Sequence, residues 1–301
     1  MYSVVYYRMR KSLFALSTGL FFLTSSLRAQ IPAGLRARLE ARIDSTASTG
    51  VGLYYRDLLT GDTLAIDGLQ RFHAASTMKL PVMIQLFRDW DAGKISLSDS
   101  LLVHDTFPSL VDGSPFTVDK SDDSDSTLYE MVGHRVSVRH LLELMETVSS
   151  NLATDVLIER IGAQRANATA HELGADSILV LRGVEDGKAY RAGKNNTTTA
   201  RDLGVLLAAL VTHRAASASS CDSMLAILSR QHFTEGIPAG LPAGAKVYHK
   251  TGWIESVVYH DAAIVALPNG RLYVLVVLTG GIKKDADAYR LVADLSRIIA
   301  G

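Results

Sequence analysis

The sequence contains a single cysteine, Cys221. One thiol excludes an internal disulfide bond, and we expect Cys221 to be a small buried hydrophobic side chain. The sequence also lacks the Cys/His spacing of a metal site, a Walker loop and a G-x-G-x-x-G motif. It therefore predicts neither a metal ion nor a cofactor.

An excess of one charge is missing as well. The 301 residues hold 31 Lys plus Arg and 31 Asp plus Glu. Such a chain has no bulk attraction for nucleic acid or for an anionic membrane, so neither is predicted as a partner. The apolar content of 48% and the charged content of 21% are typical of a globular protein with ample core.

The N-terminus has the order of a secretory signal. Arg8, Arg10 and Lys11 precede an apolar stretch at 13–23, and small residues follow up to Ala29. The apolar stretch is too short to span a bilayer comfortably, which favours a cleavable signal with cleavage near Ala29 over a retained membrane anchor. We expect a periplasmic or secreted protein without a stable membrane span after processing.

Strand-like segments lie near both ends of the chain, and helical periodicity dominates the middle. The segment 51–67 turns at Thr60-Gly61-Asp62, and the segment 262–278 turns at Pro268-Asn269-Gly270. The predicted fold class is α/β, an α+β sandwich. An antiparallel sheet of about five strands comes from both termini and is flanked by helices, and an all-helical subdomain is inserted. The expected helices include 34–46, one that begins near Ser137, and 286–299.

We expect residues 30–301 to form one domain after removal of the signal peptide 1–29. Its α/β part comprises 30–72 and 231–301, and its helical part comprises 73–230. An acidic patch, DDSDS at 122–126, lies in a predicted loop at 105–130 and is expected to be solvated.

Ser76 and Lys79 stand three residues apart in the segment HAASTMKLP. On a helix this spacing places both side chains on one face, and a lysine with a lowered pKa can take the proton of a serine hydroxyl. Alternatively, Ser76 caps a helix and Lys79 is solvated. Because S-x-x-K arises about once by chance in this composition, the pair alone decides nothing.

Two further motifs follow along the chain. Ser149-Ser150-Asn151 lies where the helix that begins near Ser137 should end, a place where Ser and Asn are common for structural reasons. Lys250-Thr251-Gly252 follows the short run KVYH on a probable strand, and it arises by chance only about 0.1 times. All three motifs in this order have a chance of roughly 0.01.

The order S-x-x-K, S-x-N, K-T-G is that of penicillin-recognising serine hydrolases. The chain resembles the class A β-lactamase superfamily over essentially all of the mature sequence, in HAASTMKLPVM, VSSNLATD, NNTTTARDL and YHKTGW. The resemblance implies that Ser76 attacks the amide carbonyl and that Lys79 takes its proton. Lys250 would lower the pKa of Lys79, and Ser149 would hand a proton to the leaving nitrogen.

The resemblance also implies the groups that hold the substrate. Asn151 would bind its side-chain amide, Lys250 and Thr251 its carboxylate, and Gly252 would keep the strand edge open. The backbone N–H groups of Ser76 and Trp253 would form the oxyanion hole, where one lost donor costs about 3 kcal/mol.

The loop that holds the hydrolytic water in class A enzymes departs from the pattern. That loop carries a glutamate and, four residues on, an asparagine. Here Glu185 is the candidate base, but Ala189 stands four residues on and the loop is about two residues shorter. Asn195 or Asn196 could substitute, and the alternative for Glu185 is a plain loop charge. Ser150 also stands where class A enzymes usually carry an aspartate.

The leading expectation is therefore a serine hydrolase that opens β-lactam rings without metal or cofactor. The substrate would be a small molecule, a β-lactam or a D-Ala-terminated peptide, and the protein a monomer. One alternative is a D,D-carboxypeptidase, transpeptidase or esterase that deacylates β-lactams slowly. The other is a non-hydrolytic module that binds β-lactams or cell-wall fragments.

Overall fold

The computed structural model describes residues 31–301. The predicted signal peptide and its cleavage near Ala29 lie outside these residues. In the described part of the chain, no helix combines the length and apolar character needed to cross a membrane.

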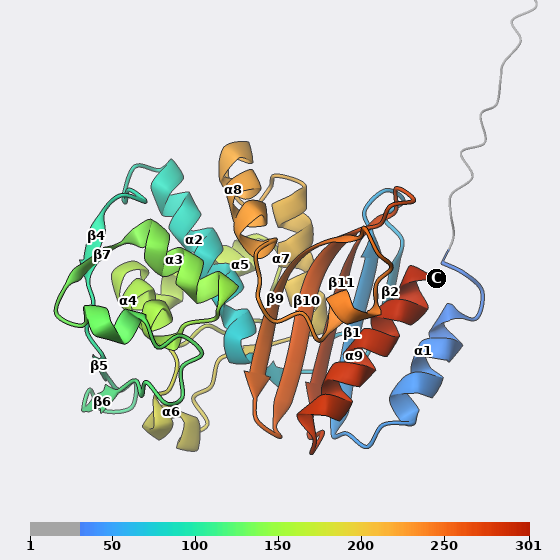
Figure 1. Ribbon diagram of the computed structural model, residues 1–301, viewed down its shortest axis with the longest axis horizontal. Coiled ribbons are helices and arrows are strands. Elements are labelled where there is room, and N and C mark those ends of the chain that lie inside the picture. Colours follow the sequence, from blue (N-terminus) through green and yellow to red (C-terminus); the bar gives the residue numbers. More distant parts are fainter. Residues whose placement is uncertain (1–30) are drawn as a thin grey trace, which may run out of the picture.

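Five strands form one antiparallel sheet in the order β2-β1-β11-β10-β9 (Figure 1). β1 (Gly50–Asp57) pairs with β2 (Thr63–Ile66) on one side and with β11 (Leu272–Gly280) on the other. β10 (Val258–Ala266) connects β11 to β9 (Lys246–Ile254), which is the edge strand. The prediction of a five-stranded sheet drawn from both ends of the chain is confirmed.

Both faces of this sheet are covered, which explains why its central strands are apolar at nearly every position. Alternate residues of β11 pack in opposite directions: Val277 joins the cluster with α1 (Leu35–Asp44) and α9 (Asp285–Ala300), and Val276 joins the cluster with the inserted helices. Figure 1 shows α1 and α9 on one face and α7 (Ala200–Val211) on the other.

The inserted region is mostly helical, but it is not all-helical as expected, because three short strand pairs lie within it. α2 (Lys79–Asp91) runs through its middle and is buried on almost all sides, including the polar side chains of Lys79, Gln85 and Asp89 (Figure 1). Cys221 is buried in α8 (Ala218–Leu228), as predicted. The remaining helices of the region are α3 (Val138–Thr147), α4 (Asn151–Ile161), α5 (Ala163–Glu172) and α6 (Gly187–Arg191).

Single turns and short strand pairs complete the described chain. The 3-10 turns are η1 (Ala75–Met78), η2 (Leu128–Met131) and η3 (Ile237–Gly240). The pairs are β3 (Phe72–His73) with β8 (Thr197–Thr198), β4 (Ser100–Leu102) with β7 (Arg135–Ser137), and β5 (Thr106–Pro108) with β6 (Pro115–Thr117).

The segment predicted as a loop at 105–130 differs from expectation because it contains the β5–β6 hairpin and η2. Gly113 supplies the left-handed backbone of the hairpin turn, with φ 72°. Phe107 and Phe116 face each other across the hairpin with ring centroids 6.2 Å apart. The cross-strand aromatic pair stabilises a structure that the polar composition of the segment does not indicate.

Candidate active site

Ser76 lies in η1, the turn between β3 and α2, and its side chain is partly exposed. The preceding residue, Ala75, has a left-handed φ of 44°, and its N–H donates to His73 Nδ1 at 3.1 Å. Thr77 donates both its N–H and its hydroxyl to the Ala74 carbonyl. A non-glycine residue at positive φ costs of order 1 kcal/mol and persists only where its surroundings hold it, a condition often found at functional sites.

Lys79 is the first residue of α2 and is completely buried. Its ammonium group donates to the Ser149 carbonyl at 2.6 Å, to Asn151 Oδ1 at 3.0 Å and to Ser149 Oγ at 3.2 Å. The solvated alternative for Lys79 therefore does not hold. In the described structure its donors turn toward the second motif, and no hydrogen bond joins Lys79 Nζ to Ser76 Oγ.

Lys250 is also completely buried, on β9. Its ammonium group donates to Ser149 Oγ and to the Thr251 carbonyl, both at 3.0 Å. Ser149 Oγ thus accepts a hydrogen bond from each lysine. A hydroxyl has two acceptor lone pairs and one donor, so its own hydrogen stays available for a third partner.

Burial lowers the pKa of both lysines, and the charge of Lys250 lowers that of Lys79 further. Burial is the larger cause for Lys79, the charge of Lys250 adds to it, and the pKa falls to about 7. Burial lowers the pKa of Lys250 to about 8, although the charges of Glu146 and Asp261 oppose the shift. Near neutral pH the site therefore contains one lysine that is partly neutral and one that is mostly charged.

Ser149 and Asn151 lie at the junction of α3 and α4. Ser149 has a left-handed φ of 62°, which turns its carbonyl and its hydroxyl toward Lys79. Ser150 caps α4 by accepting the N–H of Ala153. The structural role predicted for Ser and Asn at a helix end is thus present at Ser150, while Ser149 and Asn151 point to the buried lysine.

Gly252 lies where β9 touches the nucleophile turn. A Cβ added at this glycine would come within 3.0 Å of Thr77 N and 3.1 Å of Ser76 N. The glycine thus permits close approach of the strand to η1. Trp253 follows it with its side chain 49% exposed, so the bulk of the indole stays outside the packed contact.

Glu185 reaches the same site from the loop 181–196. Its Oε1 accepts the Asn151 side-chain amide at 2.6 Å, and its Oε2 accepts the Asp119 N–H at 3.0 Å. Burial raises the pKa of Glu185, although these two hydrogen bonds oppose the shift. Neither Asn195 nor Asn196 contacts Glu185 in the described residues, so Asn151 is its amide partner.

The two asparagines instead hold the beginning of the loop 181–196. Asn196 accepts the N–H groups of Leu181 and Arg182, and Asn195 accepts the guanidinium of Arg182. Asp155 on α4 accepts the N–H of Val184 at 2.7 Å. The course of the loop is thereby fixed on both sides of Glu185.

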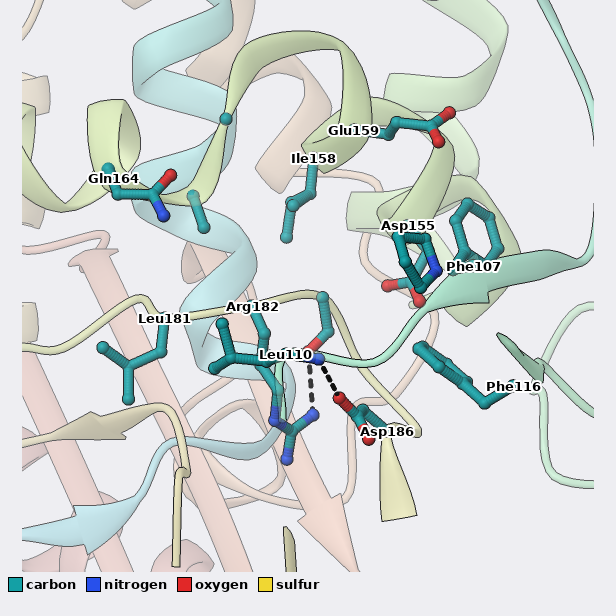
Figure 2. Close-up of a pocket in the computed structure, with 14 residues that line it drawn as sticks. Phe107, Leu110, Phe116, Asp155, Ile158, Glu159, Gln164, Leu181, Arg182 and Asp186 are labelled. Atoms are coloured by element: carbon teal, nitrogen blue, oxygen red, sulfur yellow. Dashed lines mark hydrogen bonds between the residues drawn. The ribbon is translucent and has the colours of Figure 1, made fainter. Parts of the chain in front are cut away.

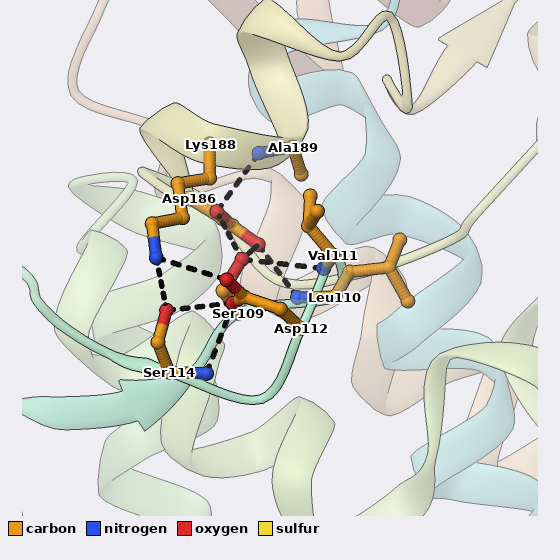
Figure 3. Close-up of polar contacts among 8 residues, drawn as sticks. All are labelled: Ser109, Leu110, Val111, Asp112, Ser114, Asp186, Lys188 and Ala189. Atoms are coloured by element: carbon orange, nitrogen blue, oxygen red, sulfur yellow. Dashed lines mark hydrogen bonds and ion pairs between the residues drawn. The ribbon is translucent and has the colours of Figure 1, made fainter.

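Asp186 anchors the far side of Glu185 (Figure 3). Its carboxylate accepts the Ser109 hydroxyl, the Leu110 N–H at 2.8 Å and the Ala189 N–H at 3.0 Å. Burial alone would raise the pKa of Asp186, but these bonds and the charge of Arg182 outweigh it and the pKa is lowered. The carboxylate therefore ties the loop to the β5–β6 hairpin.

A cavity of about 260 Å³ lies beside this loop (Figure 2). Leu181 and Arg182 of the loop, Phe107 and Phe116 of the hairpin, and Ile158 of α4 contribute to its lining. None of the three sequence motifs lines the cavity, so it is separate from the candidate active site.

Asp123 is a site residue that the sequence reasoning did not identify. It belongs to the acidic patch expected to be solvated, but its carboxylate accepts the N–H groups of Asn151 and Leu152, each at 2.9 Å, and the Ser150 hydroxyl at 3.3 Å. A carboxylate thus lies beside the second motif although Ser150 is not an aspartate. The expectation of a solvated patch was wrong at Asp123, because the chain folds back to cap α4. It was also wrong at Asp125, which is buried and accepts the N–H and the hydroxyl of Thr127.

In residues 31–301 no group of three or more His, Cys, Asp and Glu side chains is arranged to hold a metal ion. The chemistry available in the described site consists of a partly exposed hydroxyl, two buried amines, a second hydroxyl between them and a half-buried carboxylate.

Comparisons with known proteins identify the family of this chain. The sequence profile described as "Beta-lactamase enzyme family" matches residues 34–301. A β-lactamase of Rhodobacter capsulatus is 30% identical over 151 residues, which is 50% of this chain and 47% of that protein. Beta-lactamase AST-1 of Nocardia asteroides is 27% identical over 266 residues, covering 86% of this chain and 81% of that protein.

Solved structures give the same result for the fold. The structure of PBP-A has a TM-score of 0.78 at 29% identity and covers 90% of this chain and 96% of its own. A mutant of PBP-A, solved as an acyl-enzyme complex with penicillin G, has a TM-score of 0.75 at 29% identity, covering 89% and 95%.

Proposed function

The chain belongs to the beta-lactamase enzyme family, and on that premise we propose that it is a serine hydrolase that opens β-lactam rings through an acyl-enzyme on Ser76. One observation carries the proposal: Lys79 and Lys250 converge on Ser149 Oγ at 3.2 and 3.0 Å, beside the turn that holds Ser76. Covalent catalysis by serine needs such a base near the hydroxyl.

Acylation begins with loss of the Ser76 proton to the neutral form of Lys79, directly or through a water molecule. Ser76 Oγ then bonds to the carbonyl carbon and the ring C–N bond breaks. The leaving nitrogen takes a proton from Ser149 Oγ, which regains one from Lys79. Both hydrogen bonds that support this relay, from Lys79 and from Lys250, end on the same oxygen.

Substrate binding requires Lys250 to be charged, whereas acylation requires Lys79 to be neutral. Lys250 with Thr251 binds the carboxylate common to β-lactams and D-Ala-terminated peptides, because a buried ammonium attracts an anion strongly. Asn151 binds the side-chain amide. The N–H groups of Ser76 and Trp253 form the oxyanion hole, and the contact between Gly252 and η1 supports this pairing.

Deacylation is assigned to Glu185 as the base that activates water. Its raised pKa makes it a stronger proton acceptor than an ordinary glutamate. Its hydrogen bond to Asn151, which also contacts Lys79, links the carboxylate to the acylation machinery.

A second candidate is a penicillin-binding peptidase that acylates but clears β-lactams slowly. Two observations favour it. Both oxygens of Glu185 already accept hydrogen bonds, and the similar protein PBP-A was captured, as a mutant, with penicillin G bound as an acyl-enzyme. The substrate would then be a D-Ala-terminated peptide.

Location outside the cytoplasm and a monomeric state remain predictions from the sequence. Cell fractionation with an antibody, together with N-terminal sequencing of the mature protein, tests the first. Sedimentation at several concentrations tests the second.

The decisive experiment is intact-protein mass spectrometry of the protein mixed with a penicillin, sampled from seconds to hours, with Ser76→Ala as control. An adduct that forms and disappears while penicillin is consumed supports the β-lactamase. A lasting adduct supports the peptidase. A wild-type protein that neither forms an adduct nor consumes penicillin would refute both.

A further inference from the structure

Glu146 is a buried carboxyl group to which the proposed mechanism assigns no role. It lies in the last turn of α3, three residues before Ser149, and is 1% exposed. Neither of its carboxyl oxygens has a hydrogen-bond partner among the described residues. The side-chain amide of Gln231 donates to its backbone carbonyl. An unpartnered buried carboxylate is costly and needs an explanation.

The charged groups whose fields reach Glu146 are the two lysines of the site. Lys250 on β9 has the larger effect and Lys79 on α2 the smaller. α4 and α8 also pack against α3. Asp155 is the buried titratable residue of α4, and His232, beyond α8, is exposed. Glu146 is thus buried near enough to the lysine pair for both charges to act on it, and among the described residues it forms an ion pair with neither.

We propose that Glu146 is a positioning residue that controls where the proton of the buried lysine cluster resides. The inference rests on the proposed function, since it assigns Lys79 the role of base. With Glu146 ionised, both lysines hold their protons. With Glu146 protonated, Lys79 can be neutral while the net charge of the cluster stays the same. The site can therefore present a neutral base and a charged Lys250 together.

The titration ranges match this role. Burial raises the pKa of Glu146 to about 7 although both lysines oppose the shift, and the pKa of Lys79 is also about 7. The two groups therefore change protonation over the same pH range, and the charge of each acts on the other. Such coupled groups titrate as a unit.

The sign of the effect of Glu146→Gln follows from the charges. Above about pH 7 the wild-type carboxylate is ionised and raises the pKa of both lysines, so its removal lowers both. Below that range Glu146 is protonated and the substitution changes no charge. The pH profile of acylation should therefore move to lower pH by about one unit on its alkaline limb, set by Lys250, and by less on its acidic limb.

The test measures the acylation rate of a penicillin between pH 5 and 10 for wild type, Glu146→Gln and Glu146→Asp. Glu143→Gln is the matched control, because Glu143 lies one turn earlier on α3 and pairs with Arg230 at the surface. We expect Glu146→Asp to restore the wild-type limbs and Glu143→Gln to leave them unchanged. A Glu146→Gln enzyme whose acylation rate changes, while both limbs of its pH profile stay at the wild-type pH, would overturn the proposal.

A second readout does not depend on β-lactam chemistry. NMR titration of protein labelled with ¹³Cε-lysine, with Lys79→Arg and Lys250→Arg for assignment, reports the pKa of each lysine. Glu146→Gln should lower both. If penicillin never acylates the protein but the lysine pKa values fall, the proposed function fails and the influence of Glu146 stands; unchanged pKa values overturn the inference.

Discussion

The two sides of the candidate site are built differently. On one side Lys79 of α2, Lys250 of β9 and Ser149 of the α3–α4 junction are buried, and each lysine donates to Ser149 Oγ at 3.0–3.2 Å. On the other side Glu185 is half-buried, has a left-handed φ of 57°, and is held through its neighbours Val184 and Asp186. Its position depends on the anchoring of a loop.

The difference separates two chemical tasks. Burial lowers the pKa of the lysines. In the proposed mechanism this provides the base for acylation, so the lysine side of the site is preorganised before substrate binds. The loop side must place a carboxylate and a water molecule against an ester formed later. We expect substitutions on the lysine side to affect acylation and substitutions on the loop side to affect deacylation.

The largest effect is expected for Lys79→Ala. Loss of the general base should slow acylation by about 10³-fold, because a positioned base contributes 10²–10⁴-fold. Stopped-flow measurement of penicillin acylation checks it, with Lys94→Ala as control because Lys94 is exposed just beyond the same helix. An acylation rate within threefold of wild type would show that another group removes the Ser76 proton.

Glu185→Gln should have the second-largest effect. The amide keeps the size of the side chain but cannot accept a proton, so hydrolysis of the acyl-enzyme should slow by about 10²-fold. Steady-state kinetics should show a fall in kcat together with a fall in KM as the acyl-enzyme accumulates. Glu159→Gln, on α4 beside the cavity and largely exposed, should change neither constant. Unchanged kcat in Glu185→Gln would assign Glu185 a structural role.

Gly252→Ala should have a smaller effect on acylation. The added methyl group would come within 3.0–3.1 Å of Thr77 N and Ser76 N, so strand and turn must separate by a few tenths of an ångström. Overpacking of this kind costs about 1–3 kcal/mol, and we expect acylation to slow by about tenfold or more. Thermal melting distinguishes this from unfolding. Normal acylation would mean that the contact is not needed for the oxyanion hole.

Asp186→Asn should change stability more than acylation. Hydrogen bonds to a charged group contribute about 2 kcal/mol at neutral pH. Because the folded-state pKa of Asp186 is lowered, its contribution is present above the unfolded pKa of about 4 and is lost as pH falls through the folded value. Urea unfolding from pH 3 to 7 should show that Asp186→Asn has a lower free energy of unfolding than wild type, and that this difference closes at low pH. A difference that stays constant with pH would exclude the charge of Asp186 as its cause.

The sequence was informative where local patterns decide structure. Alternating and periodic apolar residues identified the strands at both ends and the closing helix, which runs over Asp285–Ala300 against the expected 286–299. The three motifs, far apart in sequence, indicated which polar residues would meet.

Other features depend on contacts that no local pattern encodes. Asp123 caps α4 from a loop that looks solvated, and Asn151, not Asn195 or Asn196, bonds Glu185. Glu146 could have been found from its place on the apolar face of α3, four residues after Leu142. The role proposed for Glu146 could be inferred only once the structure placed Lys250, from the far end of the chain, near it.

The account is tested most directly by measuring acylation and deacylation rate constants separately for Lys79→Ala and Glu185→Gln, with one penicillin, by rapid quench and intact-protein mass spectrometry. The account predicts that Lys79→Ala loses acylation, whereas Glu185→Gln acylates at the wild-type rate within about threefold and retains the adduct. Equal loss of acylation in both variants would contradict the assignment of the two sides to two steps.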